Sequence, residues 1–130
     1  MDSRRIRRVA LAAAYLVAAA AVCAQERAAS VRMLVQNSPL AGFRHHAAAE
    51  VWRDLRVGDP LELAREPENP HDASAVSVSW RGRKLGYVPR RDNATLAWGL
   101  DRGEPLQARI SRLAEHPNPS RRIEFEVFIE

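Results

Sequence analysis

The stretch AREPENPHDASAVSVSW, residues 64–80, decides how this chain folds. Its two prolines, Pro67 and Pro70, stand three positions apart. Each proline keeps the residue before it, Glu66 or Asn69, out of the α region of backbone conformation. The stretch therefore begins as an extended loop whose shape is largely fixed before any ligand arrives, and such a loop can present polar side chains to a partner.

The second half of the stretch predicts a β-strand. Residues 75–80 alternate, so that Val76, Val78 and Trp80 share one face and small side chains share the other. A compact turn at residues 81–84 then leads into another short apolar run. The two runs and the turn between them predict a β-hairpin.

The remaining chain adds further short strands and one helix. Pro89 suits the first position of a helix, and Gly103 suits its end. The segment 43–52 contains an alanine-rich part that would suit a helix by propensity, but the strands that follow lead us to expect a strand there. The other expected strands cover residues 31–36, 61–64, 106–111 and 123–130.

These elements predict a mainly β fold. Five to seven short strands with one or two short helices, in about 100 residues, favour a small antiparallel β-barrel. A parallel α/β fold is disfavoured because it needs repeated helical crossovers.

The first 24 residues have the pattern of a secretory signal peptide. Four arginines precede an uncharged run at residues 9–22, which at 14 residues is shorter than the ~20 that span a bilayer. Val22 and Ala24 are small enough for signal peptidase. We expect cleavage after Ala24 and a periplasmic or secreted protein without a membrane span. The alternative is a domain anchored to the membrane by an uncleaved leader.

Composition narrows the possible functions. The whole chain carries a net charge of +4, but without residues 1–24 it holds 16 basic and 15 acidic residues, a net charge of +1. A polybasic, sequence-blind nucleic-acid binder is not indicated, so any anion site must be a local cluster. The single cysteine, Cys23, lies in the leader. The remaining chain therefore has neither a disulfide framework nor thiol chemistry.

Three segments together resemble the HIRAN domain: FRHH at 43–46, LAREPENPHDASAVSV at 63–78 and LGYVPRRDNA at 85–94. The likeness runs from about residue 40 to 110 and is expected to reach the end of the chain. We accordingly divide the chain into a signal peptide at 1–24, a lead-in with the first strand at 25–39, and a HIRAN domain at 40–130. Such domains are found fused to helicases and nucleases and also alone in bacteria.

The resemblance implies a barrel related to oligonucleotide-binding (OB) folds that grips the 3′ end of single-stranded DNA. In such a site, aromatic rings stack on bases, basic groups hold phosphate, and a carboxylate accepts a hydrogen bond from the terminal hydroxyl. The positions that match the family's nucleic-acid-binding residues are Arg44, His45, His46, His71, Asp72, Tyr87, Arg90 and Arg91. Three positions that are often tyrosine in the family are histidine here, which predicts weaker binding or binding that depends on pH near ~6.5.

Several of these residues have simpler structural explanations. Asp72 follows Asn69-Pro70 and would equally serve as a turn former that accepts backbone N–H bonds. Tyr87 would fit the barrel core, and Arg90 and Arg91 would fit a solvated helix start.

Enzymatic functions find little support in the sequence. His45, His71 and Asp72 are weak candidates for zinc ligands, because neighbouring strand residues such as His45 and His46 point to opposite faces. The sequence contains no GxxxxGK phosphate loop and no evident nucleophile and base. We therefore expect no cofactor and no ATPase or nuclease activity.

The sequence thus predicts a monomeric, non-catalytic module that binds single-stranded DNA or its 3′ end. The first alternative is an exported envelope module that binds a polymer, such as an anionic glycan, or a protein. A more distant alternative is a zinc-binding domain associated with hydrolase activity.

Overall fold

The computed structural model describes residues 31–130, and residues 32–130 of it form one compact unit. The predicted signal peptide and residues 25–30 of the predicted lead-in lie outside the described residues. Within the described part, no helix combines the length and the apolar character needed to cross a membrane.

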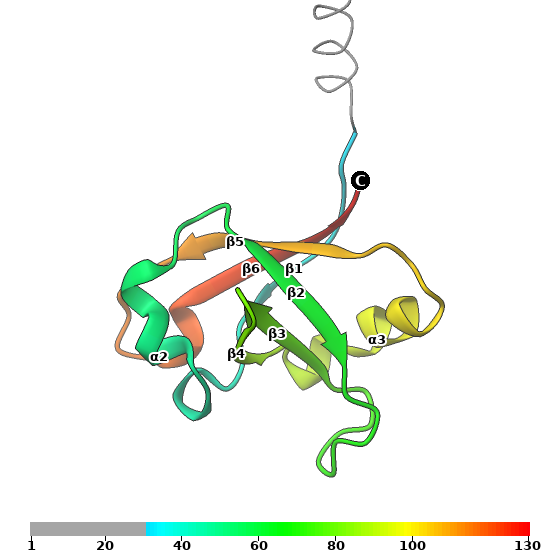
Figure 1. The fold of residues 1–130 in the computed structure, drawn as a ribbon, viewed down its shortest axis with the longest axis horizontal. Coiled ribbons are helices and arrows are strands. Elements are labelled where there is room, and N and C mark those ends of the chain that lie inside the picture. Colours follow the sequence, from blue (N-terminus) through cyan, green and yellow to red (C-terminus); the bar gives the residue numbers. More distant parts are fainter. Residues whose placement is uncertain (1–30) are drawn as a thin grey trace, which may run out of the picture. The chain divides into compact units, whose positions relative to one another are not determined.

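Six strands and two α-helices make up the domain (Figure 1). The strands are β1 (Met33–Pro39), β2 (Pro60–Arg65), β3 (Val76–Trp80), β4 (Arg83–Tyr87), β5 (Gln107–Leu113) and β6 (Ile123–Ile129). The α-helices are α2 (Ala48–Val51) and α3 (Ala94–Asp101). Four single 3₁₀ turns complete the list: η1 (Phe43–His45), η2 (Trp52–Asp54), η3 (Arg90–Asp92) and η4 (Pro119–Arg121).

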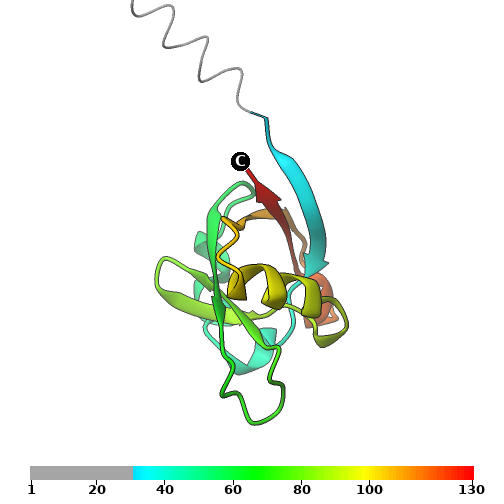
Figure 2. The ribbon, with the colours of Figure 1, turned by 90° about the vertical axis from the view of Figure 1, so that its right-hand side faces the viewer.

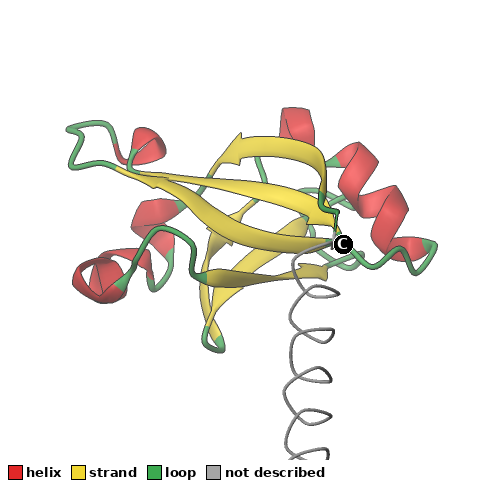
Figure 3. Ribbon diagram, turned by 90° about the horizontal axis from the view of Figure 1, so that it is seen from above, coloured by secondary structure: helices red, strands yellow, loops and turns green. Residues whose placement is uncertain are grey.

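The strands form one antiparallel sheet in the order β1-β6-β5-β2-β3-β4. Strand β6 illustrates why these segments form strands: Ile123, Phe125 and Val127 alternate with polar residues and are fully buried, so one face of the strand packs on the core. Figure 2 shows β1 and β6 side by side, and Figure 3 shows the helices at opposite ends of the strands. The mainly β, antiparallel architecture predicted from the alternation is confirmed.

The two edges of the curved sheet meet at one point. Ala41, just after β1, and Tyr87, at the end of β4, exchange two backbone hydrogen bonds of 2.9 Å each. The approach is so close because residue 86 is glycine: a Cβ there would lie 2.1 Å from the Ala41 carbonyl oxygen. The sheet is thus an open, OB-like structure joined by a single bridge rather than a barrel closed along its length.

The predicted strand at residues 43–52 is wrong. The segment forms η1, α2 and η2 instead. The buried residues Ala48 and Val51, with Leu55 just beyond the segment, recur with helical spacing and not with alternation. Gly42, at φ 80°, turns the chain out of the strand direction immediately before η1.

The hairpin and the helix follow the prediction closely. The turn between β3 and β4 is reduced to Arg81 and Gly82, which both have positive φ, as a tight hairpin requires. The predicted helix begins with η3 and continues as α3, and Gly103 follows its end with φ 75°. These elements place the β2–β3 loop and the start of η3 close to the Ala41–Tyr87 bridge.

Candidate nucleic-acid interface

The β2–β3 loop projects from the sheet (Figures 1 and 2) and is held by its own hydrogen bonds. The Glu66 N–H donates to the Ala75 carbonyl at 3.0 Å and closes the base of the loop. Inside it, Asn69 Oδ1 accepts the His71 N–H at 2.9 Å, and the Ala75 N–H donates to the Asp72 carbonyl at 3.1 Å. The loop is therefore a succession of tight turns with a fixed shape, as the two prolines predict.

The Asp72 carboxylate ties this loop to the start of α3. Its Oδ1 accepts the Ser74 N–H at 2.9 Å, and its Oδ2 accepts from the Asn93 side-chain amide at 2.7 Å. These two bonds, with Arg90 Nε 3.7 Å from Oδ2, lower the pKa of Asp72. Asp72 thus acts as the predicted turn former. Its carboxylate stays ionised at neutral pH, and both of its oxygens keep lone pairs for further hydrogen bonds.

One pocket brings most of the predicted site residues together. We call this hollow of about 510 Å³ the central pocket. It draws its lining from three separate parts of the chain: the turn after β1, the β2–β3 loop and the end of β4. The predicted residues that line it are His45, His46, His71, Asp72, Tyr87 and Arg90.

Arg44 and Arg91 do not line the central pocket. Arg44 lies in a neighbouring hollow, which His45 also lines. Arg91 lies in another hollow, which shares Ala41 with the central pocket. Both arginines are exposed, so of the three predicted arginines only Arg90 lines the central pocket, and the other two lie in neighbouring hollows.

His45 and His46 lie on the same pocket, contrary to the prediction that they point to opposite faces. The prediction fails because His45 ends a 3₁₀ turn and is not in a strand. His46 packs edge to face on Tyr87, with 5.3 Å between ring centroids and 68° between planes. Burial, assisted by Lys84 and His45, lowers the pKa of His46 below its usual 6.5. The ring is therefore neutral at neutral pH.

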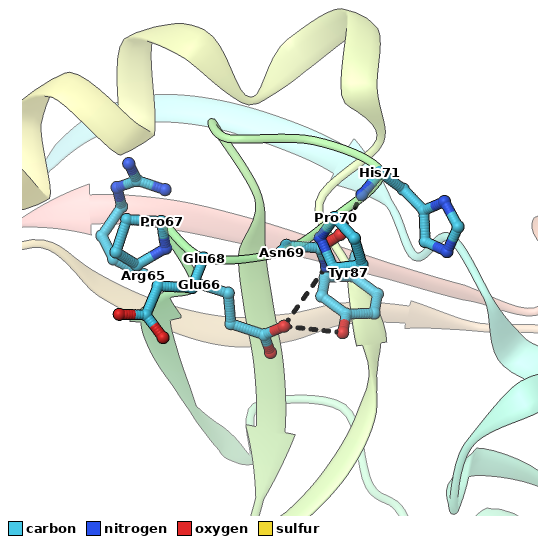
Figure 4. A pocket seen from close by; sticks show the side chains of 8 residues that line it. All are labelled: Arg65, Glu66, Pro67, Glu68, Asn69, Pro70, His71 and Tyr87. Atoms are coloured by element: carbon cyan, nitrogen blue, oxygen red, sulfur yellow. Dashed lines mark hydrogen bonds between the residues drawn. The ribbon is translucent and has the colours of Figure 1, made fainter.

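An acidic hollow of about 540 Å³ adjoins the central pocket and shares Asn69, His71 and Tyr87 with it. Figure 4 shows the Glu66 side chain directed at the Tyr87 hydroxyl. That hydroxyl donates to Glu66 Oε1 at 2.9 Å, and Lys84 Nζ donates to Glu66 Oε2 at 2.6 Å. The polar cluster fixes the Tyr87 ring, which forms a wall common to both hollows.

Glu66 and Lys84 belong to this cluster, although the sequence did not indicate either as a site residue. The hydrogen bond from Lys84 lowers the pKa of Glu66, and the bond to Glu66 raises the pKa of Lys84. The one available signal was that Lys84 is the sole lysine of an arginine-rich chain.

The zinc candidates His45, His71 and Asp72 line the same pocket. Across residues 31–130, however, no three His, Cys, Asp or Glu side chains are arranged to hold a metal ion.

Comparisons with known proteins give the family. The family model of the HIRAN domain matches residues 33–130, which include β1. A crystal structure of a protein from Lactobacillus plantarum superposes with a TM-score of 0.65 at 26% identity, over 75% of this chain and 94% of that one. The crystal structure of the HIRAN domain of human HLTF superposes with a TM-score of 0.56 at 16% identity, over 75% and 78% of the two chains. No curated protein matches the sequence. With a family model that covers all six strands, this chain belongs to the HIRAN domain family.

Proposed function

We propose that this domain is a non-catalytic DNA-binding module that holds the 3′ end of a single strand in the central pocket. Membership of the HIRAN family supports DNA binding. The observation that carries the proposal is the convergence of six predicted residues, from three parts of the chain, on one hollow.

The lining offers the groups that a strand end requires. The rings of His45, His46, His71 and Tyr87 provide faces for base stacking, and Arg90 provides a cation for a phosphate. The histidines come from turns, and Tyr87 comes from strand β4 with its hydroxyl held by Glu66 and Lys84. Side chains that are held before binding lose little conformational entropy.

Asp72 supplies the preference for an end. A phosphate on the 3′ oxygen, as in an internal nucleotide, would place its negative charge beside the ionised carboxylate and be repelled. A terminal hydroxyl can instead donate a hydrogen bond to one of the free lone pairs of Asp72. The low pKa of Asp72 keeps this acceptor charged through the neutral range.

The test uses oligonucleotides of equal sequence with a free 3′ hydroxyl or a 3′ phosphate. Fluorescence anisotropy should show at least about ten-fold tighter binding of the free end, equivalent to roughly 1.4 kcal/mol. Replacing Asp72→Asn removes the repulsion and should narrow this difference. The variant Asp54→Asn, at an exposed acid on η2, is the matched control. Equal affinity of the wild-type protein for both oligonucleotides, or no binding of either, contradicts the proposal.

The leader pattern favours a second candidate, an exported module of the cell envelope. In that case the ligand is either extracellular DNA or an envelope polymer such as an anionic glycan. The same pocket serves both, and competition of a polyanionic glycan with a 3′-hydroxyl oligonucleotide distinguishes them. Displacement of the oligonucleotide by the glycan favours the envelope polymer, provided that the carboxylate concentration of the glycan equals the phosphate concentration of the oligonucleotide.

A further inference from the structure

A hollow on the far side of Ala41 adjoins the central pocket and contains two arginines. We call this space of about 440 Å³ the arginine hollow. Its apolar part comes from prolines and aliphatic residues at the end of β1 and the start of η3. Arg91 contributes charge from η3, and Arg121 contributes it from η4. Ala41 belongs to the lining of both spaces, so they are neighbours that share this residue as a wall.

The charges of these arginines are available to a ligand. Within the described residues, Arg121 forms no ion pair, unlike Arg65, Arg102 and Arg109, each of which contacts a carboxylate. Arg91 has only its neighbour Asp92, at 3.4 Å, and its side chain is 77% exposed. Glu124 is the sole acidic residue in the lining, so the hollow keeps a net positive charge.

The wall that carries Arg121 is rigid. Asn118 Oδ1 accepts hydrogen bonds from the Ser120 N–H at 3.1 Å and from the Ser120 hydroxyl at 2.8 Å. Arg122 Nε donates to the His116 carbonyl at 2.7 Å, and its guanidinium lies 5.1 Å from the centre of the Phe43 ring. The loop before β6 is thereby fixed against η1, which lowers the entropic cost of using Arg121 in binding.

Other routes out of the central pocket suit a nucleic acid less well. Within the described residues, the acidic hollow contains no cation for a phosphate: its Arg65 already pairs with Asp101, and Glu68 adds a negative charge beside the Glu66–Lys84 pair. The Arg44 hollow is not a separate route, because it shares Ser120 with the arginine hollow and lies on the same side. No aromatic side chain lines the arginine hollow, so it offers charge without a surface for base stacking.

We propose that the arginine hollow binds the sugar–phosphate backbone beyond the three nucleotides at the 3′ end, with Arg91 and Arg121 contacting successive phosphates that a three-mer lacks. This inference rests on the proposed function, because the strand must leave the central pocket, and it adds a route across Ala41. Contacts from guanidinium groups to phosphates carry no sequence information. Binding in the arginine hollow should therefore make the affinity depend on the length of the oligonucleotide and not on its sequence.

The test compares 3′-hydroxyl oligonucleotides of three and ten nucleotides by fluorescence anisotropy at several salt concentrations. Arg121→Gln should lower the affinity for the ten-mer about five-fold and reduce its salt slope by about 0.7, the value of one phosphate contact on a single strand. The ratio of ten-mer to three-mer affinity should fall with it. Arg121→Lys should keep most of the slope, because it keeps the charge.

Arg53→Gln, an exposed arginine on η2 that lines none of these hollows, is the matched control and should change neither affinity. An unchanged salt slope in Arg121→Gln, or equal losses for three-mer and ten-mer, overturns the arginine route while leaving the central pocket in place. Absence of binding of both oligonucleotides to the wild-type protein overturns the proposed function, and the route with it.

Discussion

At the scale of single residues, Lys84 connects the stability of the domain to the shape of the central pocket. It bridges Glu66 and the Tyr87 hydroxyl, at 2.6 and 3.1 Å, and Tyr87 supports the His46 ring. The cluster is partly exposed, with 37% and 27% of the Lys84 and Glu66 side chains accessible, so water screens much of the attraction.

We predict that Lys84→Met lowers the free energy of unfolding by about 0.5–1 kcal/mol at pH 7. The pKa of Glu66 is lowered by folding, so its ion pair stabilises the fold above its usual value of 4.5 and is lost as the pH falls through its folded pKa. Folding raises the pKa of Lys84, so the stabilisation from its charge is fully present below the usual pKa of 10.5 and is lost only as the pH rises through the folded pKa. The deficit of the variant should therefore shrink in acid, as urea unfolding at pH 7 and pH 3 would measure.

The neighbouring Arg83→Met is the control for this prediction. Arg83 pairs with Glu50, but the two side chains are 49% and 68% exposed, so the loss should be smaller. A Lys84→Met deficit that is the same at pH 3 and pH 7 would show that packing of the lysine stem, and not the ion pair, is responsible.

The sequence indicated the individual residues of the central pocket better than the residues that contact them. The family motif placed six residues on the central pocket, because motif positions keep their place on the fold. The Glu66–Lys84 pair joins residues 18 positions apart, one just after β2 and the other on β4, and Arg121 reaches the site from a loop that no motif covers. Such pairings depend on strand register, which one sequence does not reveal.

At the scale of elements, alternation predicts the strands and fails for short helices. Strands β3 and β6 alternate clearly and were confirmed. Helix α2 is four residues long, too short for a helical period to stand out, and its neighbours in the chain are 3₁₀ turns. Two features distinguish it from a strand: the helix propensity of its alanines, and the buried spacing of Ala48 and Val51 with Leu55 beyond the helix.

The junction of β4 with the turn after β1 provides the element-scale prediction. Gly86→Ala should lower the free energy of unfolding by at least about 2 kcal/mol, because the new Cβ would overlap the Ala41 carbonyl oxygen, a backbone atom that cannot turn aside. Breaking the Ala41–Tyr87 bridge should also displace η1 from the pocket and weaken oligonucleotide binding. Chemical denaturation and anisotropy on the same variant measure both effects.

Gly99→Ala is the matched control for the junction. Its Cβ would approach the Glu104 carboxylate at 2.7 Å, but that group ends a flexible side chain and can move. Alanine also favours the helix that holds residue 99. We expect a change below about 1 kcal/mol. Equal effects of the two substitutions would exclude the backbone contact as the cause.

At the scale of the whole molecule, the sheet order explains how a small domain assembles a site from distant segments. Because β1 and β4 are the two edge strands and meet at Ala41 and Tyr87, the residues that follow β1 lie next to those that follow β4. The β2–β3 loop reaches the same junction, since β3 pairs with β4. Connectivity alone thus brings rings, a carboxylate and arginines to one place.

Export directed by the leader would decide which DNA ends are available to this junction, because an exported protein encounters only DNA outside the cytoplasm. We predict that the mature protein begins at Gln25, because Val22 and Ala24 suit signal peptidase. Intact-mass spectrometry of protein recovered from a bacterial host should show the loss of residues 1–24, and with them three units of net positive charge. Ala24→Trp, too bulky for the cleavage site, should retain the leader, whereas Ala28→Trp should be cleaved normally. A wild-type mass that includes Met1 would instead indicate an anchored domain.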